Sequence, residues 1–240
     1  MDMSIIIPAY NEAGNLEALV SEVARTTAML PVCEIIVVDD CSNDGSQGIL
    51  AALQKEFPQL RLLQHAQRGG QSAALWTGAL RARGELIVTL DGDGQNDPAD
   101  IAALFNVYQE RGGANGHTLV AGQRKRRHDS FVRRLSSRVA NTARAAMLND
   151  GVRDTGCSLK LFRRQDFVAL PFFNHLHRFI PALMKARGAE ILLIEVGHRP
   201  RLHGLSKYGL WDRLWVGIAD LFGVRWLLSR LKPLTESTER

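Results

Sequence analysis

Residues 3–39 of the chain read MSIIIPAYNEAGNLEALVSEVARTTAMLPVCEIIVVD. Two short runs rich in β-branched residues lie at the ends of this stretch, over 3–8 and 34–39. Neither run alternates between apolar and polar residues, as a strand with one exposed face would. Between the runs, four apolar residues recur at the spacing of one helix face: Leu16, Leu19, Val20 and Val23. The stretch therefore predicts a β-α-β unit with two buried parallel strands.

The same alternation continues along the first half of the chain. Helices are expected over 46–57, 71–81 and about 97–109, and strands over 60–64, 85–90 and 118–121. Beyond Gly122 we expect a helix over about 131–148, an irregular stretch over 150–164, a helix over about 179–186, a strand over 190–196 and a helix over 210–231. We predict one α/β domain over 1–209 with a mostly parallel central sheet, followed by an amphipathic helical extension and a disordered polar tail over 210–240.

The composition fits a globular protein with an uneven charge. Of the 240 residues 45% are hydrophobic and 23% are charged, and the formal net charge is +5. Residues 1–117 hold 7 basic and 15 acidic residues, a net −8, whereas the rest of the chain has a net +13. An acidic half suits a metal-bearing site, and a basic half suits a polyanionic partner or a membrane face.

The cysteines and the apolar runs limit where the protein acts. Cys33, Cys41 and Cys157 match neither a disulfide framework nor a zinc motif, which favours a reducing compartment. The N-terminus lacks the pattern of a signal peptide, and no uncharged run approaches the roughly 18 apolar residues of a spanning helix. Export and integral membrane insertion are both disfavoured.

A carboxylate motif follows directly after the expected strand 85–90. Its potential ligands are Asp91, Asp93 and Gln95, hard oxygen donors that can hold Mg²⁺ or Mn²⁺ and leave positions free for substrate phosphates. An EF-hand calcium loop is excluded, because Asn96 and Ala102 stand where its glycine and glutamate are required. An aspartyl-phosphate phosphatase motif is also disfavoured, because it would follow the first strand and carry threonine at the position of Gln95, whereas this motif follows a later strand. A plain Asp-Gly turn remains an alternative.

Polar residues also follow the first two strands, over 8–12 (PAYNE) and 39–45 (DDCSNDG). Neither segment contains the glycine pattern of a dinucleotide site or a P-loop, so a metal must hold any phosphates bound here. Asp40, at a strand end, can accept hydrogen bonds from a base or a ribose. Turn formation or helix capping is the alternative for Asp40 and for Asp44.

Several segments together resemble a known family. They are IPAYNE at 7–12, IVVDDCSNDG at 36–45, GQSAAL at 70–75 and the Asp91-x-Asp93-x-Gln95 motif. With these segments the chain resembles a family 2 inverting glycosyltransferase of GT-A fold. DTGCSLKLF at 154–162 and RLHGLSKY at 201–208 are similar to the dolichol-phosphate mannosyltransferase-like, polyprenyl-phosphate glycosyltransferase branch.

The resemblance implies roles for particular residues. The nucleoside would be bound by Pro8, Tyr10, Glu12 and Asp40. Metal and diphosphate would be held by Asp91, Asp93 and Gln95. The acceptor phosphate would contact Arg124, Arg133 and Ser137, and the catalytic set would be Asp93, Arg124, Arg201 and Lys207. Gly92 and Gly94 stand where relatives usually carry larger apolar residues, so a looser metal loop is expected.

The resemblance also implies the substrates. Donors would be nucleoside diphosphate sugars such as GDP-mannose or a UDP-sugar, and the acceptor a dolichyl or undecaprenyl phosphate. Because a lipid phosphate is already an anion at pH 7, no strong protein base is needed. A soluble or protein acceptor is the alternative, and it would need a base for which Asp154 is the candidate. Processive polysaccharide synthases carry Q-x-x-R-W, whereas Phe222 stands here in place of the glutamine.

Seven cations fall within residues 124–138. A nucleic-acid-binding module is a weak alternative, because Phe131 is the only aromatic residue there and no nucleic-acid motif is present. An anionic membrane surface explains the same charges. We therefore expect no nucleic acid partner and a peripheral position on the cytoplasmic face of a membrane through 210–231. The alternative is that this helix packs on the domain, on a second copy of the chain or on a small membrane partner.

Overall fold

The computed structural model describes residues 1–112, 117–124, 147–148, 150–152, 154–200 and 210–231. In the last range, side chains are described from Gly217 onward. The expected helix over about 131–148 lies almost wholly outside these ranges. So do the polar tail and four predicted site residues: Arg133, Ser137, Arg201 and Lys207.

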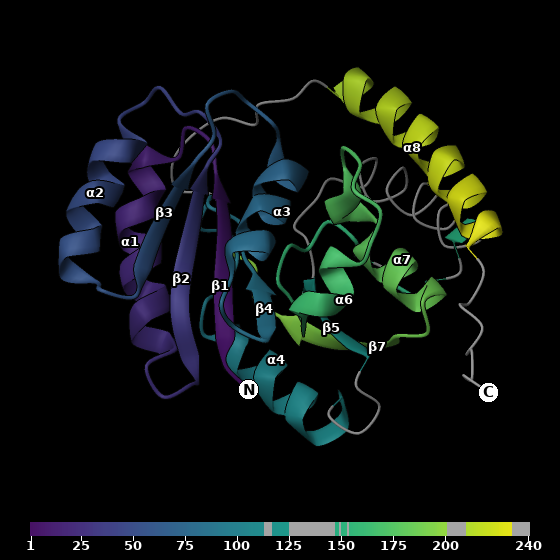
Figure 1. The fold of residues 1–240 in the computed structure, drawn as a ribbon, viewed down its shortest axis with the longest axis horizontal. Helices are drawn as coiled ribbons and strands as arrows, with labels where there is room; N and C mark the ends of the chain where they lie inside the picture. Colours follow the sequence, from purple (N-terminus) through teal and green to yellow (C-terminus); the bar gives the residue numbers. More distant parts are fainter. Residues whose placement is uncertain (113–116, 125–146, 149, 153, 201–209, 232–240) are drawn as a thin grey trace, which may run out of the picture.

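A seven-stranded sheet forms the centre of the molecule, in the order β3-β2-β1-β4-β6-β5-β7 (Figure 1). The strands are β1 (Met3–Ala9), β2 (Val32–Asp39), β3 (Leu60–Gln64), β4 (Leu86–Thr89), β5 (Thr118–Arg124), β6 (Lys160–Arg163) and β7 (Glu190–Val196). Strands β3, β2, β1 and β4 run parallel to one another, as do β5 and β7. Strand β6 is antiparallel to both of its neighbours. The prediction of a mostly parallel sheet is confirmed.

Helices cover both faces of this sheet. They are α1 (Ala13–Thr26), α2 (Ser46–Glu56), α3 (Gln71–Arg81), α4 (Asp100–Val107), α6 (Arg164–Val168), α7 (Ile180–Ala186) and α8 (Leu210–Arg230), with a π-helical turn η1 (Tyr108–Gly112) and a 3-10 turn η2 (Leu176–Arg178). In Figure 1, α1 and α2 lie on one side of strands β1–β3 and α3 lies on the other.

Neighbouring residues of one strand belong to different cores. Ile5 and Ile7 of β1 pack in a cluster with the apolar faces of α1, α2 and α4, whereas Ile6 packs in a second cluster with α3, α6 and α7. Because both faces of the strand are buried, its sequence has no polar alternation.

Three sequence-based expectations differ from the structure. The stretch 150–164, expected to be irregular, contains β6, whose four residues are too few to show a period and include two cations. Strand β5 extends to Arg124 because it pairs with β7 along its whole length. Helix α4 begins at Asp100 rather than at 97, and the Asp97 carboxylate accepts a hydrogen bond from the Ala99 backbone N–H, 3.0 Å away.

Helix α8 packs one face on the domain and leaves another exposed. Val224 is buried in the same cluster as α3 and α7, with Leu221, Leu227 and Leu228 packed against it. Asp220 accepts a hydrogen bond from His175 at 2.7 Å. Ile218, Phe222 and Trp226 lie four residues apart and are exposed, the last two by 62%. No helix in the described parts of the chain is both long and apolar enough to cross a membrane.

Candidate active site

The loops that carry the predicted site meet at one edge of the sheet. Because β2, β1 and β4 are adjacent and parallel, the segments after them, 40–45, 10–12 and 91–95, leave the sheet at the same edge. The contact is close: a Cβ atom added at Gly92 would lie 2.9 Å from the Pro8 carbonyl oxygen. The predicted metal loop therefore lies directly against a predicted nucleoside-binding residue.

The two glycines of this loop have structural roles. At Gly92 a side chain would force the backbone of Pro8 to move, so glycine is what allows this close approach. The expectation of a looser metal loop stays a prediction. Gly94 has a φ of +71°, in the left-handed region that glycine adopts without strain. Both residues therefore permit the backbone conformation that presents Asp91 and Asp93.

The two carboxylates and the amide are held by neighbouring groups. Gln71, the first residue of α3, donates its side-chain N–H to Asp91 Oδ1 at 2.7 Å. The Gln95 backbone N–H donates to Asp93 Oδ1 at 3.1 Å, and the Gln95 amide nitrogen donates to the Arg199 carbonyl at 3.4 Å. The amide oxygen of Gln95 is then the atom it offers to a ligand. These hard oxygen donors fit Mg²⁺ or Mn²⁺.

The charge balance of the site also fits a divalent cation. Burial, together with the nearby carboxylate of Asp93, raises the pKa of Asp91 to about 6. A hydrogen bond with Ser158 and the positive charges of Lys160 and Arg124 lower the pKa but do not compensate fully. A cation at this place would relieve the repulsion between the carboxylates. In the described part of the chain no group of three or more His, Cys, Asp or Glu could hold a metal ion by itself.

The raised pKa of Asp91 leads to a prediction about stability. Asp91→Asn is expected to stabilise the metal-free protein at pH 8 by up to about 3 kcal/mol, because the variant does not bury this charge. The folded-state pKa of about 6 lies above the ordinary value of 3.8, so wild-type stability falls as pH rises from 3.8 through 6. Thermal unfolding in chelator should show little difference between the two proteins below pH 4. An equal difference at both pH values would contradict the assignment.

Two of the predicted nucleoside-binding residues, Asp40 and Tyr10, have well-defined partners within the protein. Both oxygens of Asp40 are used: Oδ1 accepts hydrogen bonds from His65 Nδ1 and the Gly69 N–H, and Oδ2 accepts one from the Gly70 N–H, each at 2.7 Å. Asp40 thus holds the loop that leads into α3. The Arg68 guanidinium on that loop lies 4.2 Å from the centre of the Tyr10 ring. Nucleoside binding by Pro8, Tyr10, Glu12 and Asp40 stays a prediction.

Asp44 has the capping role that the sequence left open. Its Oδ1 accepts hydrogen bonds from the backbone N–H and the hydroxyl of Ser46, at 3.1 and 2.5 Å, where α2 begins. Its Oδ2 accepts one from the Ala13 N–H at 2.9 Å, where α1 begins. Burial alone would raise the pKa of Asp44, but these hydrogen bonds outweigh it and lower the pKa. The carboxylate ties two neighbouring loops of the site together.

A cavity of about 190 Å³ opens beside Asp91. It is lined by Gln71, Leu75, Thr89, Asp91, Thr155, Gly156, Cys157, Ser158, Lys160, His177, Arg178 and Ile180. Lys160 is buried, donates to the Cys157 carbonyl, and has its pKa lowered by burial. Burial and the nearby Arg178 lower the pKa of His177 to about 3, so its ring is neutral at pH 7. The sequence reasoning gave no role to Lys160 or His177, which reach this site from distant segments.

Arg124 and Asp154 form a two-pronged ion pair. Arg124 Nε donates to Asp154 Oδ2 at 2.6 Å, and Nη2 donates to Oδ1 at 2.7 Å. Burial alone would lower the pKa of Arg124, but Asp154 outweighs this and raises it. Asp154 therefore orients the guanidinium, which makes it a poor candidate for a base. The placement of Arg133, Ser137, Arg201 and Lys207 lies outside the described residues and stays a prediction.

Comparison with known proteins decides the family. Residues 4–170 match the sequence model of the family glycosyl transferase family 2. The chain belongs to glycosyl transferase family 2. It is 34% identical over 233 residues to dodecaprenyl-phosphate galacturonate synthase of Rhizobium johnstonii, covering 95% of this chain and 68% of that protein. It is also 34% identical over 210 residues to undecaprenyl-phosphate 4-deoxy-4-formamido-L-arabinose transferase of Aeromonas hydrophila, covering 87% and 63%. The chain thus spans about two thirds of the length of these relatives.

Solved structures of other proteins show the same fold. Mannosyl-3-phosphoglycerate synthase from Rubrobacter xylanophilus superimposes with a TM-score of 0.70 at 16% identity, covering 100% of this chain and 79% of that one. Glucosyl-3-phosphoglycerate synthase from Mycobacterium tuberculosis, in complex with Mn²⁺, UDP and phosphoglyceric acid, gives 0.71 at 18% identity, covering 96% and 79%. This family 2 protein is a glycosyltransferase of GT-A fold. Its predicted resemblance to the polyprenyl-phosphate branch is confirmed by the two relatives named above.

Proposed function

We propose that this glycosyltransferase transfers one sugar, with inversion, from a nucleoside diphosphate sugar to a polyprenyl phosphate. The donor would be GDP-mannose or a UDP-sugar, and the acceptor a dolichyl or undecaprenyl phosphate. The observation that carries the proposal is the Asp91–Asp93 pair beside a cavity of about 190 Å³. That volume corresponds to roughly six water molecules, which suits a single sugar ring. The names of both relatives support a polyprenyl phosphate acceptor.

In the proposed mechanism each residue has a distinct role. Asp91, Asp93 and Gln95 would hold Mg²⁺ or Mn²⁺, and the bound ion would supply Lewis-acid stabilisation of the departing diphosphate. Gln71 keeps the Asp91 carboxylate in place through its hydrogen bond. Lys160, buried in the cavity wall, adds positive charge close to the carboxylates.

The acceptor phosphate needs cations rather than a base, because its oxygen already carries negative charge. Arg124 is suited to this role, since its guanidinium is always charged and Asp154 fixes its orientation. Arg133 and Ser137 are proposed to complete the acceptor site, and Arg201 and Lys207 to lie near the diphosphate. With Asp154 engaged by Arg124, the geometry favours a phosphate acceptor over an alcohol that would need deprotonation.

We also propose a peripheral position on the cytoplasmic face of a membrane, and the exposed face of α8 supports contact with a membrane surface. Ile218, Phe222 and Trp226 form a continuous apolar stripe, while the opposite face of the helix packs on the domain. Aromatic side chains of this kind partition to the headgroup boundary. A helix that lies flat would place the active site near a polyprenyl phosphate whose headgroup sits at that depth.

The acceptor class is tested by product extraction. Full-length protein with Mg²⁺ is given radiolabelled GDP-mannose, UDP-glucose and UDP-galacturonate in turn, together with undecaprenyl phosphate. We expect label from one donor to move into the butanol phase, and only when the lipid phosphate is present. Transfer to 3-phosphoglycerate in preference to the lipid would contradict the proposal and would favour a soluble acceptor.

A further inference from the structure

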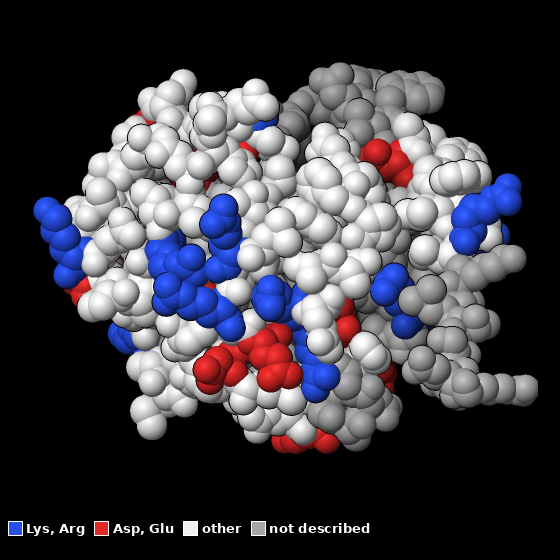
Figure 2. Space-filling model, in the orientation of Figure 1, with Lys and Arg blue, Asp and Glu red and all other residues white. Residues whose placement is uncertain are grey.

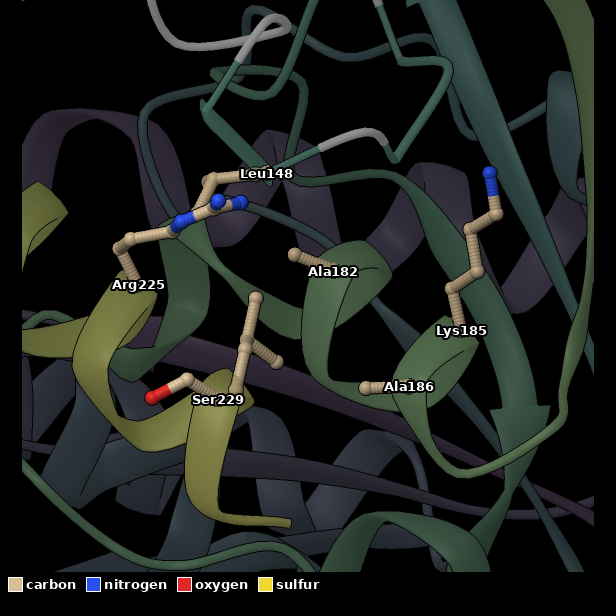
Figure 3. A pocket seen from close by; sticks show the side chains of 7 residues that line it. Leu148, Ala182, Lys185, Ala186, Arg225 and Ser229 are labelled. Carbon is tan, nitrogen blue, oxygen red and sulfur yellow. The ribbon is translucent and has the colours of Figure 1, made fainter. Parts of the chain in front are cut away.

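A second pocket, of about 360 Å³, lies between α7 and α8 (Figure 3). Its lining residues are Leu148, Ala182, Lys185, Ala186, Arg225, Leu228 and Ser229. None of them lines the cavity beside Asp91. The glycosyl-transfer site described above therefore gives this pocket no role.

The pocket combines an apolar lining with two cations. Leu148, Ala182 and Leu228 supply apolar surface, whereas Lys185 and Arg225 are exposed. Figure 3 shows the Arg225 guanidinium close to Leu148, and the Lys185 side chain on the other side of Ala182. Arg225 donates one N–H to the Met147 carbonyl at 2.7 Å, and a guanidinium has five N–H groups in all.

The charges around the pocket favour an anionic ligand. No lining residue is acidic, and α7 contains no acidic residue. On the part of α8 whose side chains are described, the only acid is Asp220, which His175 engages. Two more cations are close in sequence: Arg187 directly follows α7, and Arg230 is the last residue of α8. Figure 2 shows basic side chains over the part of the molecule where α7 and α8 lie in Figure 1, with a smaller acidic area nearby.

The pocket adjoins the exposed stripe of α8. Trp226 follows Arg225 directly in sequence, and Phe222 lies one helical turn earlier. A ligand that reached both the pocket and this stripe would need an anionic head and an apolar tail. A free phosphate ion would use the cations but not the apolar lining.

We propose that the α7–α8 pocket binds the phosphate headgroup of an anionic phospholipid, whose acyl chains run along Ile218, Phe222 and Trp226. The inference rests on the proposed membrane position but not on the proposed reaction. It assigns to Lys185 and Arg225 the recognition of a membrane lipid, separate from the acceptor phosphate at Arg124. Bound lipid would hold α8 in its present orientation on the domain.

Binding of phosphatidylglycerol to the full-length protein tests the proposal. Binding to vesicles of phosphatidylglycerol and phosphatidylcholine is measured by sedimentation, and binding of dihexanoyl phosphatidylglycerol below its micelle concentration is measured by calorimetry. No sugar nucleotide is present, so the result is independent of glycosyl transfer. Lys185→Gln and Arg225→Gln should each weaken both kinds of binding about fivefold, the effect of one cation near an anionic surface.

Three further variants separate a pocket from diffuse surface charge. Ala186→Leu fills the pocket from an exposed helix position without changing the charge, and it should also weaken binding of the short-chain lipid at least fivefold. Trp226→Ser should weaken vesicle binding more than short-chain binding. The matched control Arg25→Gln removes an exposed cation on α1. It should change neither vesicle binding nor short-chain lipid binding by more than twofold.

Two results would overturn the proposal. If the glutamine variants weaken vesicle binding but Ala186→Leu leaves short-chain binding intact, the cations act only as a charged surface. If inorganic phosphate binds as tightly as the short-chain lipid, the pocket takes free phosphate. The two proposals remain distinguishable. If the wild-type protein transferred no sugar but the pocket variants lost binding of the short-chain lipid, the lipid site would be supported and the proposed glycosyl transfer would not.

Discussion

Asp93→Ala is expected to lower kcat for glycosyl transfer by at least about a thousandfold, because removing one carboxylate leaves too few ligands to hold the metal against the diphosphate. The same change should leave the unfolding temperature in chelator nearly unaltered. Asp93 lies in the loop after β4, its side chain is partly exposed, and it belongs to neither core cluster, so it contributes little to the core. Initial rates at saturating donor, with thermal unfolding in parallel, measure both quantities.

A matched variant separates loss of the site from loss of charge. Asp2→Ala removes one exposed carboxylate beside the start of β1, at the opposite end of the strands from the metal loop, and should keep full activity. Two results would exclude the Asp91–Asp93 metal site: full activity of the wild-type protein in excess chelator, or a kcat of Asp93→Ala above a tenth of the wild-type value.

Arg124→Gln is expected to lower kcat/KM for the lipid acceptor by about a hundredfold, because a charge-assisted contact to the acceptor phosphate is lost. Nucleotide affinity, measured by calorimetry, should change less than threefold. The variant should also lose about 2 kcal/mol of stability, since the Asp154 carboxylate keeps its partly buried position without its partner. Arg81→Gln, which removes an exposed cation at the end of α3, is the control.

A double variant of Arg124 and Asp154 distinguishes two roles for Asp154. If Asp154 only orients Arg124, adding Asp154→Asn to Arg124→Gln should cause little further loss of activity, because the two changes remove one interaction. If Asp154 were a catalytic base, Asp154→Asn alone would remove activity more completely than Arg124→Gln does. A nucleotide affinity that falls with Arg124→Gln would move this arginine to the donor site.

The strands of the β-α-β units could be predicted because burial on both faces leaves a clear signal. In β1 and β2 nearly every core position is apolar, and the sequence shows this as continuous runs. Strand β6 gives no such signal. Its position between β4 and β5 depends on pairing with residues some 40 to 75 positions away, and only the two residues between Lys160 and Arg163 are apolar.

The candidate site was predictable where one segment carries all its parts. The Asp91–Gln95 motif follows a recognisable strand, so both its position and its ligand chemistry could be inferred. His177 and Arg68 were missed because each comes from a segment that carries no motif. Lys160 lies in the 154–162 segment that carries the family resemblance, but nothing in that segment indicates that its side chain is close to Asp91. Their relevance follows from burial or from a neighbour, as with Lys160 close to Asp91, and such contacts exist only in the folded chain.

The C-terminal helix shows the limit of a periodicity argument. Its apolar residues were expected to form one wide face for a membrane, with packing on the domain as the alternative. In the structure Val224 is buried against the domain while Phe222 and Trp226, on another side of the helix, are exposed. A wide apolar face can pack on the domain with some of its residues and expose the others. The spacing of apolar residues in the sequence does not indicate which residues do which.

Determining the mass and the anomeric configuration of the product tests the central claim most directly. Full-length protein is incubated with Mg²⁺, the donor identified by extraction and a short-chain polyprenyl phosphate, and the product is examined by mass spectrometry and NMR. We predict a polyprenyl phosphate bearing one sugar, with the anomeric configuration opposite to that of the donor. A product with retained configuration, several sugars in a chain, or the sugar on a soluble acceptor would contradict the proposed reaction.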